Sequence, residues 1–183
     1  MYQIITLYLL LAGAAVSILL MRLHPVFAIA NLCCGLGLCL LACGHLNRSQ
    51  TDALTGVGNR HYLNQLRPHY RKIASLTAVY VDLDDLKRIN DIHGHAAGNK
   101  ALAEVGAALQ AVCRRDERVY RMGGDEFLLL SKSADANSLA ARMAQAQTSA
   151  SLSYGIAAGS GADLDALIQT AEKAMYTMKK QVP

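Results

Sequence analysis

The sequence predicts an α+β fold, a mainly antiparallel sheet covered by helices, preceded by a two-helix transmembrane hairpin. Three observations predict it. Two long uncharged apolar runs open the chain, short β-branched strands then alternate with helices, and two strands meet at a glycine pair. The 183 residues leave room for one domain with its own core and a small additional element.

The two opening runs, at about residues 2–21 and 26–44, contain no charged residue. Each is close to the length of about 20 residues that crosses the roughly 30 Å hydrocarbon layer of a bilayer. We therefore expect a transmembrane hairpin over 1–45, a linker over 46–51 and a domain over 52–183. A cleaved signal peptide is the alternative for the first run, but the basic segment that opens such peptides is absent.

The first half of the domain predicts a helix, a strand and two more helices. Residues 61–75 favour a helix that is disturbed near Pro68. Residues 76–83 are apolar and β-branched, which is typical of a buried strand. A short helix should follow and end near Gly94, and residues 99–112 repeat apolar side chains on one helical face.

The second half predicts a hairpin and three further elements. Residues 118–122 and 126–130 read as strands joined through Gly123 and Gly124, a pair that supplies the positive φ angles of a two-residue turn. The chain should close with a helix, a strand and a helix, at 137–147, 150–158 and 163–180.

Acidic residues stand at two strand ends of this predicted sheet. Asp125 and Glu126 follow the glycine pair, and taken alone they fit solvated turn residues equally well. Asp82, however, ends the first buried strand and is expected to face the hairpin tip. Two adjacent carboxylates repel each other unless a cation lies between them. Mg²⁺ suits such a site because it takes one or two carboxylates and leaves its other positions to water and phosphates.

The segment after Asp82 predicts an anion site. The helix that begins near Asp85 and Leu86 points its first amides outward with the positive end of its dipole. Lys87 adds a point charge, although alone it would read as a surface lysine. Together these features indicate a triphosphate site.

Four separated motifs then resemble one family. "DALTGVGNR", "DLDDLKRINDIHGHAAGN", "RMGGDEF" and "AEKAMYTMKK" occur in the order found in GGDEF-domain diguanylate cyclases, over Asp52 to about Lys180. The resemblance implies a cyclase-palm-like sheet. It also implies a reaction that joins two GTP molecules into cyclic di-GMP and releases two pyrophosphates.

The resemblance assigns a role to each motif residue. Asp82, Asp125 and the backbone carbonyl of Leu83 would hold Mg²⁺ or Mn²⁺, two ions per active site. Asp125 or Glu126 would help to deprotonate the attacking hydroxyl, and Lys87 would neutralise phosphate charge. The implied substrate-binding residues are Lys87, Asn90, His95, Asn99, Gly124 and Lys179. A structural role in the loop is the alternative for His95.

The same resemblance implies GTP as substrate and a homodimer, because one domain holds one GTP and the reaction needs two. It leaves the downstream cyclic di-GMP receptors unnamed. GTP is cytosolic, so we expect a multi-pass protein of the bacterial inner membrane with a cytoplasmic catalytic domain. The net charge of +4 forms no basic stripe, which argues against nucleic acid.

Three positions depart from the family pattern. Asn99 replaces the usual Asp, which opens the alternative of relaxed purine selectivity. Glu117 takes the Asp place of the inhibitory Arg-x-x-Asp motif that begins at Arg114, so this site would be degenerate. Pro183 stands where an arginine is frequent. A non-catalytic nucleotide-binding regulatory module and a membrane-tethered interaction protein therefore remain as alternatives.

Overall fold

The computed structural model describes residues 11–16, 29, 32–39, 50–133, 135–146 and 148–180. The chain divides into two compact units, Met1–Asn47 and Arg48–Pro183. In the first unit, residues 11–16 and 32–39 are helical. The predicted hairpin lies largely outside the described residues, and no helix within them is both long and apolar enough to cross a bilayer.

The second unit is built on a mixed sheet with the strand order β1-β3-β4-β2-β5. Its strands are β1 Gly58–Asn59, β2 Leu76–Leu83, β3 Arg118–Gly123, β4 Glu126–Ser131 and β5 Leu152–Gly159. β1 pairs with β3 in parallel. The pairs β2–β4, β2–β5 and β3–β4 are antiparallel. The predicted α+β fold with a mainly antiparallel sheet is confirmed.

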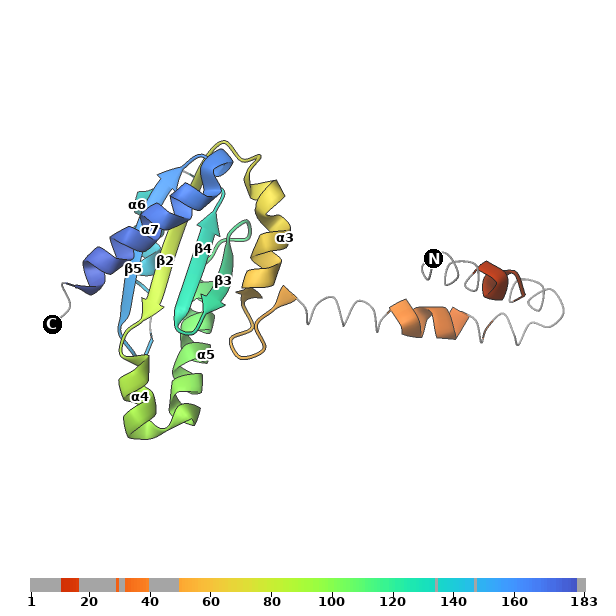
Figure 1. Ribbon diagram of the computed structural model, residues 1–183, viewed down its shortest axis with the longest axis horizontal. Helices are drawn as coiled ribbons and strands as arrows, with labels where there is room; N and C mark the ends of the chain where they lie inside the picture. Colours follow the sequence, from red (N-terminus) through yellow and green to blue (C-terminus); the bar gives the residue numbers. More distant parts are fainter. Residues whose placement is uncertain are drawn as a thin grey trace. The chain divides into compact units, whose positions relative to one another are not determined.

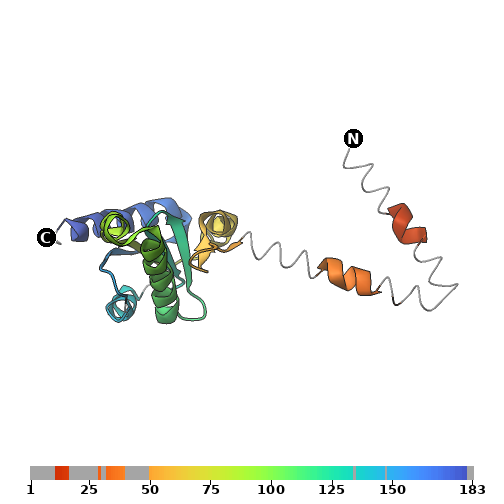
Figure 2. The same ribbon diagram turned by 90° about the horizontal axis from the view of Figure 1, so that it is seen from below.

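Helices cover both faces of the sheet in three layers (Figures 1 and 2). The helices of this unit are α3 Arg60–Tyr70, α4 Leu86–His93, α5 His95–Val112, α6 Ala136–Met143 and α7 Leu164–Lys179, with a short 3₁₀ turn Gly161–Asp163 before α7. α3 and α7 pack on one face in a first apolar cluster. α5 and α6 pack on the opposite face in a second cluster.

The interior strand β2, which lies between β4 and β5, is buried along its whole length. Ala78 and Tyr80 belong to the cluster under α3 and α7, whereas Val79 and Val81 belong to the cluster under α5. Side chains alternate between the two faces of a strand. Asp82 therefore falls on the face of Tyr80, which is the face that α7 covers.

Two differences from the sequence-based expectation bear on the site. α5 begins at His95 rather than near Asn99, because Gly94, at φ +82°, ends α4 and lets the next helix start at once. The hairpin turn also lies one residue later than predicted. Gly123 still belongs to β3 and pairs with Glu126, after a register irregularity between Arg121 and Gly123. The turn is therefore Gly124–Asp125, which places Asp125 in the turn itself.

Candidate active site

The two strand ends that carry the acidic residues lie side by side. Asp82 pairs in register with Glu126 across the β2–β4 ladder. The Leu83 backbone N–H donates a hydrogen bond to the Asp125 carbonyl, with a nitrogen–oxygen distance of 3.1 Å. The end of β2 and the turn before β4 are therefore fixed side by side by main-chain bonds.

Asp82 is the most enclosed of these acidic residues, with 6% of its surface exposed. Burial raises its pKa, and the negative charge of Asp125 raises it further against the opposing effect of Lys179. The Lys179 ammonium on α7 forms an ion pair with Asp82 Oδ1. Burial lowers the pKa of Lys179, but its hydrogen bond to Asp82 and the surrounding negative charges together outweigh burial, and the net pKa is raised. Asp82 thus sits where a positive charge is stabilised.

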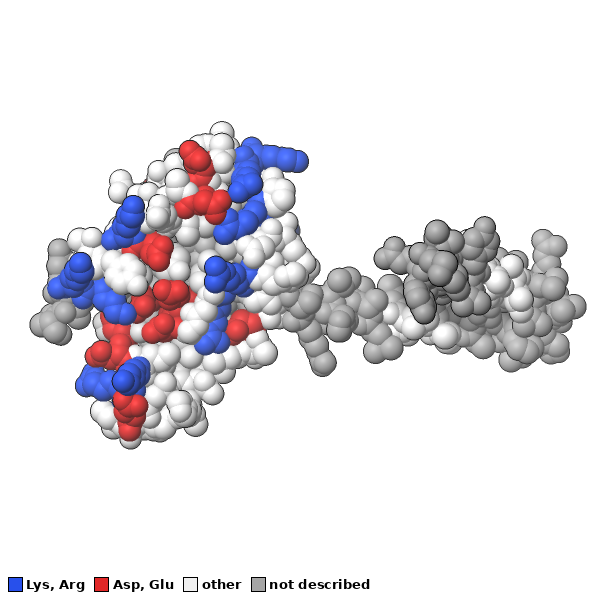
Figure 3. All heavy atoms as spheres, viewed as in Figure 1, with Lys and Arg blue, Asp and Glu red and all other residues white. Residues whose placement is uncertain are grey.

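Glu126 points to the face that α3 and α7 cover. Its Oε2 accepts a hydrogen bond from the Tyr80 hydroxyl at 3.1 Å. Burial, together with the charge of Glu126, raises the pKa of Tyr80, so the hydroxyl remains a donor. A groove of about 330 Å³ lies beside it and is lined by Arg60, Arg67, Tyr80, Met122, Glu126, Ile168 and Glu172. Figure 3 shows acidic side chains gathered near the centre of this face, with basic side chains around them.

Within the described residues, the connection from β2 to α4 leaves polar groups without hydrogen-bond partners. Asp85 adopts a left-handed conformation, with φ 57°, and its side chain makes no capping bond to the first turn of α4. The first amides of a helix need an acceptor from outside the helix. Lys87 is exposed on the same turn. Asp84 Oδ1 accepts from Ser153 Oγ at 2.7 Å, while its buried Oδ2 has no hydrogen-bond partner within the described residues.

The predicted base-recognition residues lie on α4 and α5. Asn90 is half-buried on α4, whereas His95 and Asn99 are exposed on the first turns of α5. Gly98 lets the two helices approach, because a Cβ at this position would overlap the Asn90 side chain and approach Leu86 Cδ1 to 3.1 Å. The Asn90 amide is thereby held in the gap between the helices.

The acidic groups fit a divalent cation that is shared with a ligand, rather than a closed metal cage. Among the described residues, no group of three or more His, Cys, Asp and Glu side chains is arranged to hold a metal. Asp82 and Asp125 supply two carboxylates, and Leu83 follows Asp82 and bonds to the Asp125 backbone. Mg²⁺ needs no more than that when substrate phosphates and water complete its shell. Gly124 has φ +50° and open space where a Cβ would lie, so a ligand has access to the turn.

The two residues of the expected inhibitory motif lie away from this site, beyond the far end of β3. Glu117 is buried, and its carboxylate accepts four hydrogen bonds, from Arg114 N, Ser131 Oγ and both terminal nitrogens of Arg142. Burial raises the pKa of Glu117, but these donors, Arg142 foremost, lower it to about 2. Arg114 itself is exposed and donates to Ser138 Oγ at 3.1 Å. The Glu117 carboxylate therefore serves the fold.

Sequence reasoning missed four residues of this region: Asp52, Tyr80, Gly98 and Arg121. Tyr80 was predictable, because it precedes Asp82 by two residues in a strand and so shares its face. Gly98 carried a weaker signal, as a glycine inside a helical pattern indicates close packing. Nothing in the sequence pairs Arg121 with Asp52, since 69 positions separate them.

Comparison with known proteins identifies the family to which this domain belongs. The profile described as "Diguanylate cyclase, GGDEF domain" matches residues 49–182. The chain is 31% identical over 150 residues to the cyclic di-GMP phosphodiesterase PdeR of Escherichia coli, which covers 72% of this chain and 23% of that protein. It is 39% identical over 84 residues to the diguanylate cyclase DgcS of Shewanella oneidensis, covering 43% and 28%. The chain thus spans about a quarter of the length of these relatives.

Solved structures agree with the sequence relatives. The GGDEF domain of PA1120 (TpbB or YfiN) from Pseudomonas aeruginosa is 30% identical, with a TM-score of 0.60, over 72% of this chain and 90% of that chain. The diguanylate cyclase SiaD of the same species, solved with its activator SiaC, shares the fold with a TM-score of 0.69 at 23% identity, over 99% of this chain and 77% of that chain. With the profile match over most of its length, this chain belongs to the GGDEF-domain family of diguanylate cyclases.

Proposed function

We propose that this protein is a diguanylate cyclase that condenses two GTP molecules into cyclic di-GMP and two pyrophosphates. The observation that carries the proposal is the meeting of Asp82 with the Gly124–Asp125 turn, where paired carboxylates lie beside Lys179. Catalytically degenerate relatives need not keep such a charge arrangement. The intact acidic pair therefore favours catalysis over nucleotide binding alone.

The binding part of the reaction falls to α4 and α5. The uncapped first turn of α4 and the exposed Lys87 would receive the triphosphate. Asn90, in the gap that Gly98 leaves, would read the guanine edge together with Asn99 and His95. Lys179 would exchange its bond to Asp82 for one to a phosphate oxygen.

The chemical part falls to the turn. The 3′-hydroxyl of one GTP attacks the α-phosphorus of the other, a phosphorus–oxygen bond forms and the α–β bridge breaks to release pyrophosphate. Asp125 or Glu126 would take the hydroxyl proton, and the Tyr80 hydroxyl keeps the Glu126 carboxylate in place. A pair of Mg²⁺ or Mn²⁺ ions held by Asp82, Asp125 and the Leu83 carbonyl would supply charge for the α-phosphate and the leaving group.

The oligomeric state that we propose follows from the two GTP molecules that the reaction needs, and the location from the exposed apolar residues of the first unit. One domain offers one GTP site, so two facing domains are needed and the active form would be a homodimer. The apolar residues of the first unit are exposed where they are described, at Leu11, Val16, Ile29, Leu32, Leu36 and Leu38. This exposure supports membrane anchoring of the chain, with the catalytic unit in the cytoplasm where GTP is found.

A second candidate, a non-catalytic nucleotide-binding module, is favoured by one observation. Asn99 is exposed beside the proposed base site and offers an amide where the family pattern has a carboxylate. An amide presents one acceptor, whereas guanine offers donors at both N1 and N2. Weak recognition of guanine would leave binding and regulation as the remaining activity.

The Asp125→Ala substitution separates the two candidates. Removing one carboxylate from a partly exposed turn should leave the circular dichroism spectrum unchanged and abolish dinucleotide synthesis from GTP with Mg²⁺. Asp116→Asn, which alters an exposed carboxylate remote from the turn, is the matched control and should keep wild-type turnover. Wild-type turnover in folded Asp125→Ala protein would contradict the cyclase assignment.

A further inference from the structure

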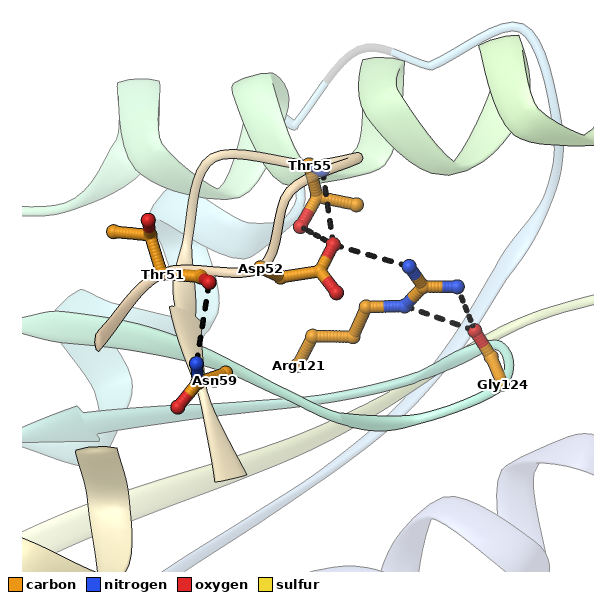
Figure 4. Close-up of polar contacts among 6 residues, drawn as sticks. All are labelled: Thr51, Asp52, Thr55, Asn59, Arg121 and Gly124. Carbon is orange, nitrogen blue, oxygen red and sulfur yellow. Dashed lines mark hydrogen bonds and ion pairs between the residues drawn. The ribbon is translucent and has the colours of Figure 1, made fainter. Parts of the chain in front are cut away.

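The guanidinium of Arg121 lies between the catalytic turn and the start of the domain (Figure 4). Its Nε and Nη2 both donate to the Gly124 carbonyl, at 3.1 and 2.6 Å. Its Nη1 donates to Asp52 Oδ1 at 3.0 Å and forms an ion pair there. The side chains of Arg121 and Asp52 are 15% and 24% exposed, so solvent screens the pair only in part.

Few other contacts of the described residues hold the Gly124–Asp125 turn. Gly124 is in the left-handed region with φ +50°, and the ladder before it is irregular between Arg121 and Gly123. Beyond the ladder, Leu83 N–H holds the Asp125 carbonyl from β2, and Arg121 holds the Gly124 carbonyl from the other side. These two carbonyls flank the Asp125 backbone. These two bonds therefore fix the backbone that carries the Asp125 side chain.

Asp52 is itself firmly placed. Its Oδ1 accepts from Thr55 N and from Thr55 Oγ, at 2.9 and 2.8 Å, which closes a tight turn. The backbone of this turn is closed by Asp52 N to Val57 O at 2.8 Å and Gly56 N to Asp52 O at 2.9 Å. α5 packs directly on Thr55 because Gly106 has no side chain there. The carboxylate that orients Arg121 is therefore fixed to a long helix of the core.

We propose that Arg121 is the positioning residue of the catalytic turn, and that Asp52 orients its guanidinium for this task. Only the kinetic consequence of this proposal rests on the cyclase activity proposed above. The position of the Gly124–Asp125 turn can be measured without any catalysis. Arg121 touches neither of the expected metal ligands through its side chain. It acts through the backbone of the turn.

Kinetics distinguish positioning from simple stabilisation. A partly exposed ion pair contributes little to the stability of a fold. A misplacement of about 1 Å at a reacting group, by contrast, costs on the order of 100-fold in rate. We therefore expect Arg121→Met to lower kcat about 10- to 100-fold. KM for GTP should stay within about twofold, because the binding groups on α4 and α5 do not move.

The dependence on Asp52 is tested by a double-mutant cycle. Asp52→Ala should lower kcat less than Arg121→Met, because Arg121 can still reach Gly124. Adding Asp52→Ala to Arg121→Met should change kcat no further, since residues that act through one another are not additive. Arg121→Lys should recover only part of the rate, because an ammonium cannot replace the fork that spans two acceptors. The control is Arg71→Met, which removes an exposed arginine that pairs with Asp165 on α7 and should be silent.

Amide hydrogen exchange supplies the readout that needs no activity. The expected result for full-length protein is faster exchange confined to residues 119–128 in Arg121→Met and, less strongly, in Asp52→Ala, with wild-type exchange in Arg71→Met. If wild-type protein makes no dinucleotide, this exchange pattern still decides the proposal. Unchanged exchange and kcat in folded Arg121→Met, or fully additive effects in the double variant, would overturn it.

Discussion

The ion pair of Glu117 with Arg142 should contribute strongly to stability at neutral pH, and its loss should weaken the fold in acid. The Glu117 side chain is 2% exposed and that of Arg142 19%. Arg142 bridges α6 to both the carboxylate and the Val112 carbonyl, and its Nε has no hydrogen-bond partner within the described residues. Replacing Glu117 with Gln removes the negative charge that the Arg142 guanidinium neutralises.

The magnitude follows from two independent routes. Breaking a buried ion pair by removing one partner costs about 3–5 kcal/mol. The pKa of Glu117 falls from 4.5 to about 2 in the folded protein. That shift corresponds to roughly 3 kcal/mol of stability, which is fully present above the unfolded pKa and is lost as pH falls through the folded pKa. About 2 kcal/mol of it should be lost between pH 7 and pH 3.

Urea unfolding followed by tyrosine near-ultraviolet circular dichroism measures this directly, because Tyr70 and Tyr120 share a buried hydroxyl hydrogen bond at the core. We expect Glu117→Gln to lower the free energy of unfolding at pH 7 by about 3 kcal/mol. The variant should also lose less stability than wild type on going to pH 3, whereas Asp116→Asn should follow wild type. Equal acid sensitivity of wild type and Glu117→Gln, with a difference below about 1 kcal/mol at pH 7, would refute the reasoning.

Three further predictions concern ligands. Gly98→Ala should raise KM for GTP about tenfold or more at nearly unchanged kcat, because the added Cβ displaces the Asn90 side chain. Steady-state kinetics test this, and an unchanged KM would show that Asn90 does not belong to the base site. Cyclic di-GMP should inhibit weakly or not at all, because the Glu117 carboxylate is committed to Arg142; calorimetry showing tight binding that Arg114→Ala abolishes would prove this wrong. Because of Asn99, discrimination of GTP against ATP should be weaker by about ten- to a hundredfold. Competition of GTP with ATP, with products separated by mass, tests this. Pure cyclic di-GMP, made at a rate that Asn99→Asp leaves unchanged, would rule it out.

The acidic Gly124–Asp125 turn was largely predictable from the sequence because its parts are local. A buried strand that ends in Asp82 and a hairpin that presents Asp125 are each visible in a few residues, and consecutive elements of a sheet tend to be neighbours. Lys179 was expected near the phosphates only from the family resemblance, and the structure pairs it with Asp82. The exact turn was misplaced by one residue, because the irregularity at Arg121–Gly123 has no signature in the glycine pair.

The remaining features depend on tertiary pairing that no short pattern encodes. Glu117 stands in the charged run "RRDE" and was interpreted as a degenerate position of the inhibitory motif, yet it is buried and bonded to Arg142, 25 positions later. Arg121 reads as an exposed strand residue until Asp52 and Gly124 are seen on either side of it. The extent of α5 was underestimated because "HAAG" looks like a loop, whereas Gly98 is there for packing.

The central claim is tested most directly by one incubation. Purified full-length protein is mixed with GTP and Mg²⁺, and the products are separated and identified by mass. We expect a cyclic dinucleotide with two guanylate units and two pyrophosphates for each ring, and no product when the metal is chelated. Saturable GTP binding without any dinucleotide would contradict it and identify the domain as a binding module.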